Sequence, residues 1–254
     1  MQRRILVTGA ASGLGRGMAA YFAQRRHKLV LIDRDAGGLE DCMMAMGAAA
    51  PAAECQALDV TSAAQIDDFL SRLADPRIDV LINCAGLQHV SPLEDFAEDR
   101  WDLLIDVMLK GPFLLSKAVL PGMRSHGFGR IINIGSIHSL VASPFKSAYT
   151  AAKHGLVGFS KVAALETAGS DITVNTICPA YVRTPLVDSQ IRAQAQSHGI
   201  SEQEVIDRIM LEPMPKKAFI TVEEIAATAE FLMSDLARNI TGQTIAIDGG
   251  WTAR

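Results

Sequence analysis

The sequence predicts an α/β fold built on a single, doubly wound parallel sheet. Two observations lead to this prediction. Short apolar runs alternate with longer amphipathic stretches along the 254 residues, which is the pattern of repeated βαβ units. The first apolar run also leads directly into a glycine-rich turn and a helix. Right-handed crossovers between parallel strands then place helices on both faces of the sheet.

The elements follow from these runs in chain order. Seven apolar runs are predicted as strands: Arg4–Thr8, Lys28–Asp33, Ala53–Asp59, Asp79–Asn83, Gly129–Ile134, Ile172–Ile177 and Gln243–Ile247. Amphipathic periodicity predicts helices near residues 13–26, 36–48, 62–74, 99–125, 147–168 and 222–233. The helices near 99–125 and 147–168 are apolar on much of their circumference, so each is buried in the core or at a subunit contact.

One segment departs from this alternation. The chain between residues 177 and 221 contains no strand pattern, and it holds two helical patterns near 186–197 and 201–211. A long excursion from a compact fold is usually a lid or a binding loop. We therefore expect one domain over residues 1–254, with a helical substrate lid at about residues 185–217.

Composition excludes several classes of protein. The 24 basic and 28 acidic residues give a formal charge of −4, which argues against nucleic acid or an anionic membrane as the main partner. No apolar run approaches the ~20 residues of a membrane span. The four cysteines have neither disulfide nor zinc spacing, and the N-terminus shows no signal-peptide pattern. We expect a cytoplasmic protein without a metal site.

The turn after the first strand is a candidate nucleotide site. Its glycines have the spacing G-x-x-x-G-x-G. Glycines allow a tight turn and a close backbone approach, and the N–H groups of the following helix point toward a pyrophosphate. A tight strand–helix turn without a ligand is the alternative, and three glycines in this context favour nucleotide binding. The candidate residues are Gly9, Ser12, Gly13, Leu14 and Gly15.

The end of the second strand indicates which dinucleotide binds. Asp33 ends that strand, where a carboxylate accepts hydrogen bonds from the adenosine ribose and repels a 2′-phosphate. This favours NAD over NADP. Arg34 follows directly and has the charge to pair with a 2′-phosphate, whereas Ser12 adds no second basic group.

A third pattern concerns acid–base chemistry. Tyr149 and Lys153 are four residues apart, on one face of a predicted helix. A nearby cation favours the phenolate, so Lys153 is expected to lower the pKa of Tyr149 and make it a usable acid or base. Ser136 follows the strand that ends at Ile134, where its hydroxyl can donate to a substrate oxygen.

Together these motifs resemble the short-chain dehydrogenase/reductase family, in order from about Arg4 to Gly250. The resemblance implies a Rossmann-type sheet, a nicotinamide cofactor and a tetramer built on the helices near 99–125 and 147–168. It implies that Tyr149 donates and accepts the proton, that Lys153 binds the nicotinamide ribose and that Ser136 orients the substrate. Further residues implied to line the cofactor are Asp59, Val60, Asn83, Ala85, Gly86, Pro179, Val182 and Thr184.

The chain departs from the family pattern at Cys84, Ala180 and Met108. Met108 stands where the family carries an asparagine at a helix kink, whose carbonyl holds a relay water. Pro112 lacks an N–H, so the carbonyl four residues earlier, that of Met108, loses its helical partner. We hypothesise that this keeps the kink and frees the carbonyl for the water. In the alternative, Met108 packs in a regular helix and the relay is broken.

Four polar residues predict the substrate. Gln88, His138, Lys146 and Gln190 lie near the motifs, and a cation with amide and imidazole donors suits a carboxylate. Each alone has an ordinary alternative as a solvated or backbone-bonded side chain. Residues 137–149 and 248–254 most resemble family members that act on a short 3-hydroxy acid. That resemblance implies that these four residues bind its carboxylate.

We therefore expect an NAD-dependent oxidoreductase that interconverts a short 3-hydroxy acid and its 3-oxo acid by hydride transfer, with Tyr149 as acid and base. Two alternatives stay open. One is a family enzyme for 3-oxoacyl thioesters or sugar-type alcohols. The other is an NAD-binding sensor with impaired catalysis, which the Met108 substitution suggests.

Overall fold

A computed structural model describes residues 2–49 and 53–253. Within them, seven parallel strands form one sheet in the order β3-β2-β1-β4-β5-β6-β7. The strands are β1 (Arg4–Thr8), β2 (Lys28–Asp33), β3 (Glu54–Ala57), β4 (Val80–Asn83), β5 (Gly129–Ile134), β6 (Ile172–Pro179) and β7 (Thr244–Ile247). The order reverses between β1 and β4, as in a doubly wound sheet. The predicted fold class is confirmed.

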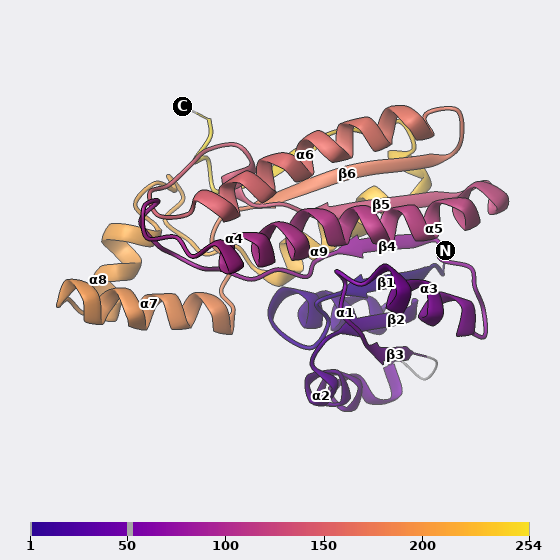
Figure 1. Ribbon diagram of the computed structural model, residues 1–254, viewed down its shortest axis with the longest axis horizontal. Coiled ribbons are helices and arrows are strands. Elements are labelled where there is room, and N and C mark those ends of the chain that lie inside the picture. The colour runs from indigo at the N-terminus through magenta and orange to yellow at the C-terminus, as the bar shows by residue number, and fades with distance from the viewer. Residues whose placement is uncertain (1, 50–52, 254) are drawn as a thin grey trace.

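Helices cover both faces of this sheet (Figure 1). They are α1 (Gly13–Gln24), α2 (Ala36–Met46), α3 (Ala63–Arg72), α4 (Glu98–Ile105), α5 (Gly111–His126), α6 (Ser147–Thr167), α7 (Pro185–His198), α8 (Glu202–Val205) and α9 (Val222–Met233). Successive strand residues face opposite sides. Ile5 and Val7 therefore pack with α1, α2 and α9, whereas Leu6 packs with α3, α5 and α6.

The helix predicted near 99–125 is interrupted. A π-helical turn, Asp106–Lys110, separates α4 from α5, and the Gly111 N–H donates to the carbonyl of Asp106. Pro112 follows at the start of α5 and has no N–H to offer to the preceding turn. The predicted helical stretch is thus present and contains a π-helical turn, and the kink at Gly111 and Pro112 stays a prediction.

The helical excursion between residues 177 and 221 is present as α7, α8 and a second π-helical turn, Ile206–Met210. Thr184 caps α7 by accepting a hydrogen bond from the Val187 N–H at 3.4 Å. The segment has a small buried core of its own, which includes Ile191 and Val205. Figure 1 shows α7 and α8 projecting beyond the end of the sheet opposite the N-terminus.

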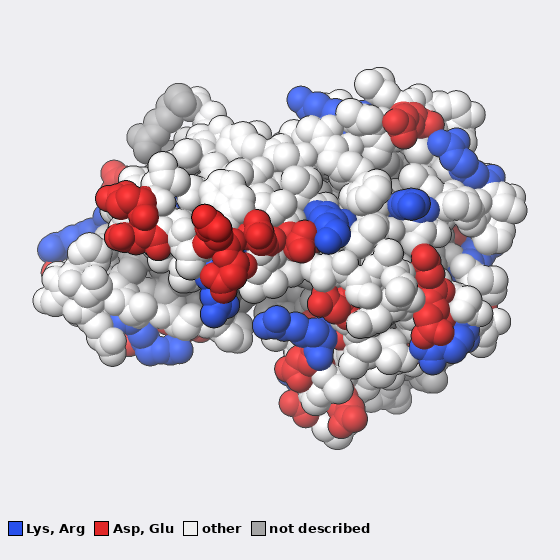
Figure 2. Space-filling view, viewed as in Figure 1, with Lys and Arg blue, Asp and Glu red and all other residues white. Residues whose placement is uncertain are grey.

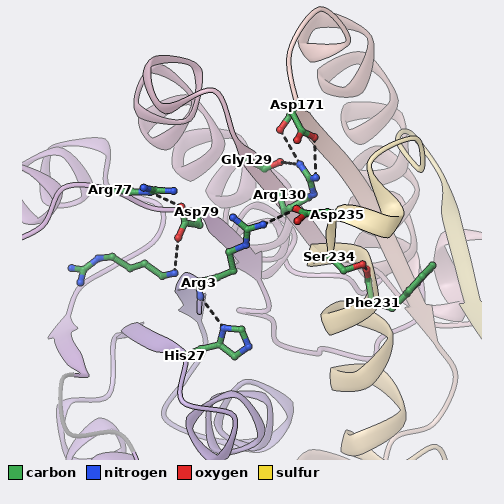
Figure 3. Close-up of polar contacts among 11 residues, drawn as sticks. Arg3, His27, Arg77, Asp79, Gly129, Arg130, Asp171, Phe231, Ser234 and Asp235 are labelled. Atoms are coloured by element: carbon green, nitrogen blue, oxygen red, sulfur yellow. Dashed lines mark hydrogen bonds and ion pairs between the residues drawn. The ribbon is translucent and has the colours of Figure 1, made fainter. Parts of the chain in front are cut away.

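The amino-terminal end of the sheet holds a buried arginine cluster (Figure 3). The Arg130 side chain is fully buried, and its guanidinium donates to the Asp171 carboxylate at 2.9 Å and to the Asp171 and Gly129 carbonyls at 2.8 Å. Arg3 donates to Asp235 at 2.8 Å. Both guanidiniums lie over the ring of Phe128, at 3.7 and 4.2 Å from its centroid. This cluster ties β1, β5 and the start of β6 together.

Removing the carboxylate partner of Arg130 should destabilise the fold. Asp171→Ala leaves a charged hydrogen-bond donor of a buried guanidinium unpaired, so we expect the free energy of unfolding to fall by about 2 kcal/mol. Urea denaturation measures the change. Asp68→Ala is the matched control, because it removes an exposed ion pair with Arg72 and should cost roughly 0.5 kcal/mol or less. Equal losses in both variants would contradict a stabilising role for Asp171.

Candidate active site

A cleft of about 630 Å³ opens at the carboxyl ends of the strands, between the loops after β1, β2, β4, β5 and β6 and the start of α7. Figure 2 shows the surface hollowed between the lobe that carries α7 and α8 and the lobe that carries α2. On this face basic and acidic side chains are interspersed. The predicted residues in the cleft wall are Gly9, Ser12, Gly13, Leu14, Gly15, Asp33, Asp59, Val60, Ala85, Gly86, Gln88, Ser136, His138, Lys146, Tyr149, Lys153, Pro179, Val182, Thr184 and Gln190.

The turn after β1 is packed too tightly for side chains. Gly9 has φ +68°, and a Cβ there would lie 2.9 Å from the Cα of Ala85. A Cβ on Gly15 would lie 2.1 Å from the carbonyl oxygen of Gly9. The Thr8 hydroxyl accepts hydrogen bonds from the N–H groups of Cys84 at 2.9 Å and Ala85 at 2.8 Å. The turns after β1 and β4 are thereby fastened together at the point where the strand order reverses.

The residues at this end fit a dinucleotide. Gly13 has φ +51°. A Cβ at this position would lie 3.9 Å from the nearest atom, in the Thr184 side chain, so this part of the turn is open. The Ser12 side chain does not cap α1 with a hydrogen bond, and the first turn of α1 carries no acidic residue. The first N–H groups of α1 are therefore available to bind an anion. The Asp33 carboxylate accepts hydrogen bonds from the Ala11 and Asp35 N–H groups, both at 3.1 Å, and is therefore held in place.

Asn83 does not lie in the cleft wall, and the expectation that it lines the cofactor stays a prediction. It is buried in β4, where its side-chain amide donates to the side-chain Oδ1 of Asn133 at 2.8 Å. Asn133 in turn donates to the Ser160 hydroxyl at 2.8 Å. The pairing places Asn83 within the sheet, and the cleft begins one residue later, at Cys84.

The reactive trio comes together at the end of β5. Ser136 caps a short 3₁₀ turn, Ile137–Ser139, while Tyr149 and Lys153 lie one turn apart on α6. All three side chains line the same cleft, and Ser136 lies near enough to the Tyr149 hydroxyl to act on its pKa. The Lys153 ammonium donates to the carbonyl of Ile134 at 2.7 Å and lies 5.7 Å from the centroid of the Tyr149 ring.

Burial dominates the electrostatics of this trio. Desolvation lowers the pKa of Lys153 to about 8. It also raises the pKa of Tyr149, and only the hydrogen bond from Ser136 acts in the opposite direction. The expectation that Lys153 lowers the pKa of Tyr149 is therefore wrong for the protein without a ligand, because the cost of burying a phenolate is the larger effect.

The other end of the cleft holds an ammonium without a counterion. Lys146 is half-buried, and burial lowers its pKa. Among residues 2–49 and 53–253 its ammonium has no hydrogen-bond or ion-pair partner, and its Nζ lies 5.8 Å from the centroid of the Tyr181 ring. Gln88 and Gln190 line the same cleft, and Gln88 uses its Oε1 to accept from the His89 N–H at 3.1 Å. The predicted polar residues thus share one cleft.

His138 is neutral in this environment. Its pKa is lowered to about 4. Burial is the largest cause, and the nearby charges of Lys146 and His154 lower it further. Its Nε2 lies 2.9 Å from the Ser143 hydroxyl, and its Nδ1 lies 3.5 Å from the Ser136 hydroxyl, a long contact. Both ring nitrogens therefore face hydroxyl groups of the protein.

Two aromatic residues back this end of the site. Tyr181 lines the cleft and stacks on Trp251, with their ring centroids 6.2 Å apart. Trp251 also packs in a T-shaped arrangement with His138, with the two ring centroids 6.2 Å apart. Trp251 does not line the cleft. Sequence reasoning did not select Tyr181, although it lies within the motif from Pro179 to Thr184, because only the fold shows that its ring faces Lys146.

The departures from the family pattern also line the cleft. Met108 is buried within the π-helical turn and lies beside Gly86, where a Cβ would be 3.7 Å from its sulfur. The freedom of its carbonyl to hold a relay water stays a prediction. Burial raises the pKa of Cys84 to about 12, so its thiol stays protonated and is a poor nucleophile.

Within the described part of the chain, no cluster of three or more His, Cys, Asp or Glu side chains has a metal-binding arrangement. None of the described helices combines the length and apolarity needed to span a bilayer.

Comparison with known proteins agrees with this geometry. Residues 9–252 match the family model described as Enoyl-(Acyl carrier protein) reductase. The chain is 43% identical to a D-beta-hydroxybutyrate dehydrogenase of Rhizobium meliloti (strain 1021), covering 100% of both chains. It is 42% identical to the Cupriavidus necator protein of the same name, covering 98% of this chain and 97% of that one. A solved actinorhodin polyketide ketoreductase with NADPH superposes with a TM-score of 0.93 at 30% identity, over 100% of this chain and 98% of that one.

The chain belongs to the short-chain dehydrogenase/reductase family. It is an oxidoreductase of a family that uses nicotinamide cofactors, and its full length matches relatives named for the oxidation of D-beta-hydroxybutyrate.

The low pKa of His138 predicts acid-sensitive stability. Between pH 6.5 and about 4 the unfolded chain binds a proton on this residue that the folded chain does not, so stability falls as the pH drops through that window. The full effect is about 3 kcal/mol below pH 4. Urea unfolding of the wild type and of His138→Gln between pH 7 and 4 should show a steeper loss in the wild type. Parallel pH dependences would contradict the prediction.

Proposed function

We propose that the protein is an NAD-dependent dehydrogenase that interconverts D-3-hydroxybutyrate and acetoacetate. The observation that carries this proposal is the unpaired Lys146 ammonium, which lies in the same cleft as Ser136 and Tyr149. Two relatives at 43% and 42% identity that are named for this substrate support it.

Lys146 anchors the substrate carboxylate in this proposal. A half-buried ammonium without a counterion forms a strong charge-assisted hydrogen bond with an anion, and the amides of Gln88 and Gln190 add neutral donors, with His138 at the same end. A carboxylate held there places the hydroxyl-bearing carbon near Ser136 and Tyr149. A thioester has no free carboxylate, so this arrangement argues against a 3-oxoacyl thioester as substrate.

Tyr149 acts as the base when the alcohol is oxidised. It removes the hydroxyl proton, while Ser136, which lines the same cleft, donates a hydrogen bond to the substrate oxygen. The oxidised nicotinamide supplies the hydride acceptor and a positive charge. Lys153, held by the Ile134 carbonyl, adds a second cation beside the phenol and binds the cofactor ribose. The Met108 carbonyl would hold the water that links Lys153 to solvent.

The choice of NAD rests on Asp33. Its carboxylate is fixed by two backbone N–H groups in the cleft wall, where it would accept from the ribose hydroxyls and repel a 2′-phosphate. Arg34 also lines the cleft, and it is the residue through which NADP would bind instead.

The surroundings of the site extend the proposal. The segment 185–217 closes over the substrate as a lid.

Exposed apolar side chains on α5 and α6 support a homotetramer built on these helices. Among them are Phe113, Val162 and Leu165, which are 45, 55 and 78% exposed. The enzyme works in the cytoplasm on a small carboxylate, without nucleic acid or membrane partners.

Turnover with defined substrates tests the proposal. Purified protein mixed with D-3-hydroxybutyrate and NAD should produce NADH, followed by its absorbance. NAD binding without turnover of any 3-hydroxy acid would favour the sensor. Turnover confined to uncharged or bulky alcohols would favour another enzyme of the family.

Removing the Lys146 charge should weaken substrate binding selectively. Lys146→Ala is expected to raise the KM for D-3-hydroxybutyrate by roughly 10- to 100-fold, because a charge-assisted hydrogen bond is lost. The KM for an uncharged analogue should change far less. Lys161→Ala, an exposed lysine on α6, is the control. Equal effects on both substrates would show that Lys146 does not bind the carboxylate.

Substituting Asp33 should relax the cofactor preference. Asp33→Ser removes the charge that repels a 2′-phosphate, so the ratio of kcat/KM with NAD to that with NADP should fall by roughly 10-fold or more. Glu40→Gln removes an exposed charge on neighbouring α2 and should leave the ratio unchanged. A wild-type enzyme that prefers NADP would overturn the cofactor assignment.

A further inference from the structure

The backbone of Phe145 adopts a conformation that its side chain disfavours. Phe145 follows Pro144 in a turn just before α6 and has φ +66°, in the left-handed region where such turns usually have glycine or asparagine. A bulky residue in this region is strained, and strained residues cluster at functional sites. Burial of the ring does not offset the strain, because the side chain is 57% exposed. Contacts of the backbone must therefore hold this conformation.

A hydrogen bond between two loops provides such a contact. The Ser91 N–H donates to the Phe145 carbonyl at 3.0 Å. Ser91 belongs to the loop after β4, a short distance beyond Gln88, whereas Phe145 directly precedes Lys146. The two loops joined here thus carry two of the residues to which the proposed function assigns the carboxylate.

The chain is also anchored on both sides of Phe145. Before it, the Ser143 hydroxyl lies 2.9 Å from Nε2 of His138, which is buried after β5. After it, the Lys146 carbonyl accepts from the Thr150 N–H at 2.8 Å as α6 begins. Because φ of Phe145 sets the direction of one anchored segment relative to the other, a negative φ there would displace Lys146 or break an anchor.

The step from Phe145 to Lys146 leads from the outside of the cleft to its inside. Phe145 does not line the cleft, whereas the next side chain, Lys146, does. The Lys146 ammonium has no hydrogen-bond or ion-pair partner among residues 2–49 and 53–253, so no polar contact of the side chain keeps it in the cleft. Its direction therefore depends on the backbone that carries it.

We propose that Phe145 is a positioning residue, whose left-handed backbone directs the Lys146 side chain into the cleft. The role belongs to the backbone conformation and not to the aromatic ring. The proposal rests on the proposed function in one respect, the assignment of Lys146 as the anchor of the substrate carboxylate. It adds that the anchor is in place before the substrate binds, which lowers the entropic cost of ordering a long, flexible side chain.

Two substitutions that both remove the ring separate the backbone from the side chain. Asparagine tolerates a positive φ, whereas the β-branched valine strongly disfavours it. Phe145→Val should therefore raise the KM for D-3-hydroxybutyrate by roughly 5- to 10-fold with kcat within about twofold, and Phe145→Asn should leave both within about twofold of the wild type. The same two changes at Leu93, which is 73% exposed on the loop after β4, are the control. Equal rises in both Phe145 variants, or no rise in Phe145→Val, would overturn the proposal.

A measurement without substrate distinguishes failure of this proposal from failure of the proposed function. Burial lowers the pKa of Lys146. In protein with ¹³C-labelled lysine, NMR titration should show this lowered pKa in the wild type and in Phe145→Asn. In Phe145→Val the pKa should return toward the ordinary lysine value, because the ammonium moves into water. An unchanged Lys146 pKa in Phe145→Val would contradict the positioning role, whatever substrate the enzyme turns over.

The contact between the loops is tested by a second pair of variants. Ser91→Pro removes the N–H that donates to the Phe145 carbonyl, whereas Ser91→Ala keeps it and is the matched control. Ser91→Pro should raise the KM as Phe145→Val does. The double variant should be little worse than either single one, because both changes remove the same contact. Effects that add fully would show that the two residues act independently and that the proposal is wrong.

Discussion

The close contact between the turns after β1 and β4 is the constraint on which the rest of the site depends. The connections that follow β1 and β4 lead to opposite sides of the point where the strand order reverses, and the crevice there is where such sheets bind ligands. In this protein the Thr8 hydroxyl holds both Cys84 and Ala85, and Gly9 lets the two backbones approach. One wall of the cleft is thereby fixed, and the ends of β5 and β6 supply the other.

Burial determines the protonation of the groups placed in that cleft. The same desolvation keeps the Cys84 thiol protonated, keeps His138 neutral and lowers the pKa of Lys153 to about 8. An ammonium and a phenol that both lie out of water respond strongly to any charge brought beside them, because the surrounding dielectric is low. A cofactor that binds beside Lys153 and Tyr149 therefore changes their acidity more than any exposed residue could.

Much of this arrangement could be predicted from the sequence, because the fold is dictated by local patterns. Alternating apolar runs predicted all seven strands within a few residues, and the glycine spacing predicted the turn after β1. The features that the sequence analysis did not predict depend on distant pairings. Asn83 is held in the sheet by Asn133, which is fifty residues away, and Arg130 is paired with Asp171 across two strands. No local periodicity carries such information, and the pKa of Tyr149 likewise depends on burial that only the folded chain creates.

The π-helical turn between α4 and α5 has a geometric consequence of its own. An α-helix turns by about 100° and rises by about 1.5 Å per residue. A π-helical turn accommodates one additional residue, and this residue changes the direction in which the side chains of the following helix face. Deleting a single residue within Asp106–Lys110 would let α4 and α5 fuse into one regular helix. One end would then be rotated by about 100° against the other. The orientation of Met108 in the cleft wall beside Gly86 thus depends on the length of the chain here as much as on its chemistry.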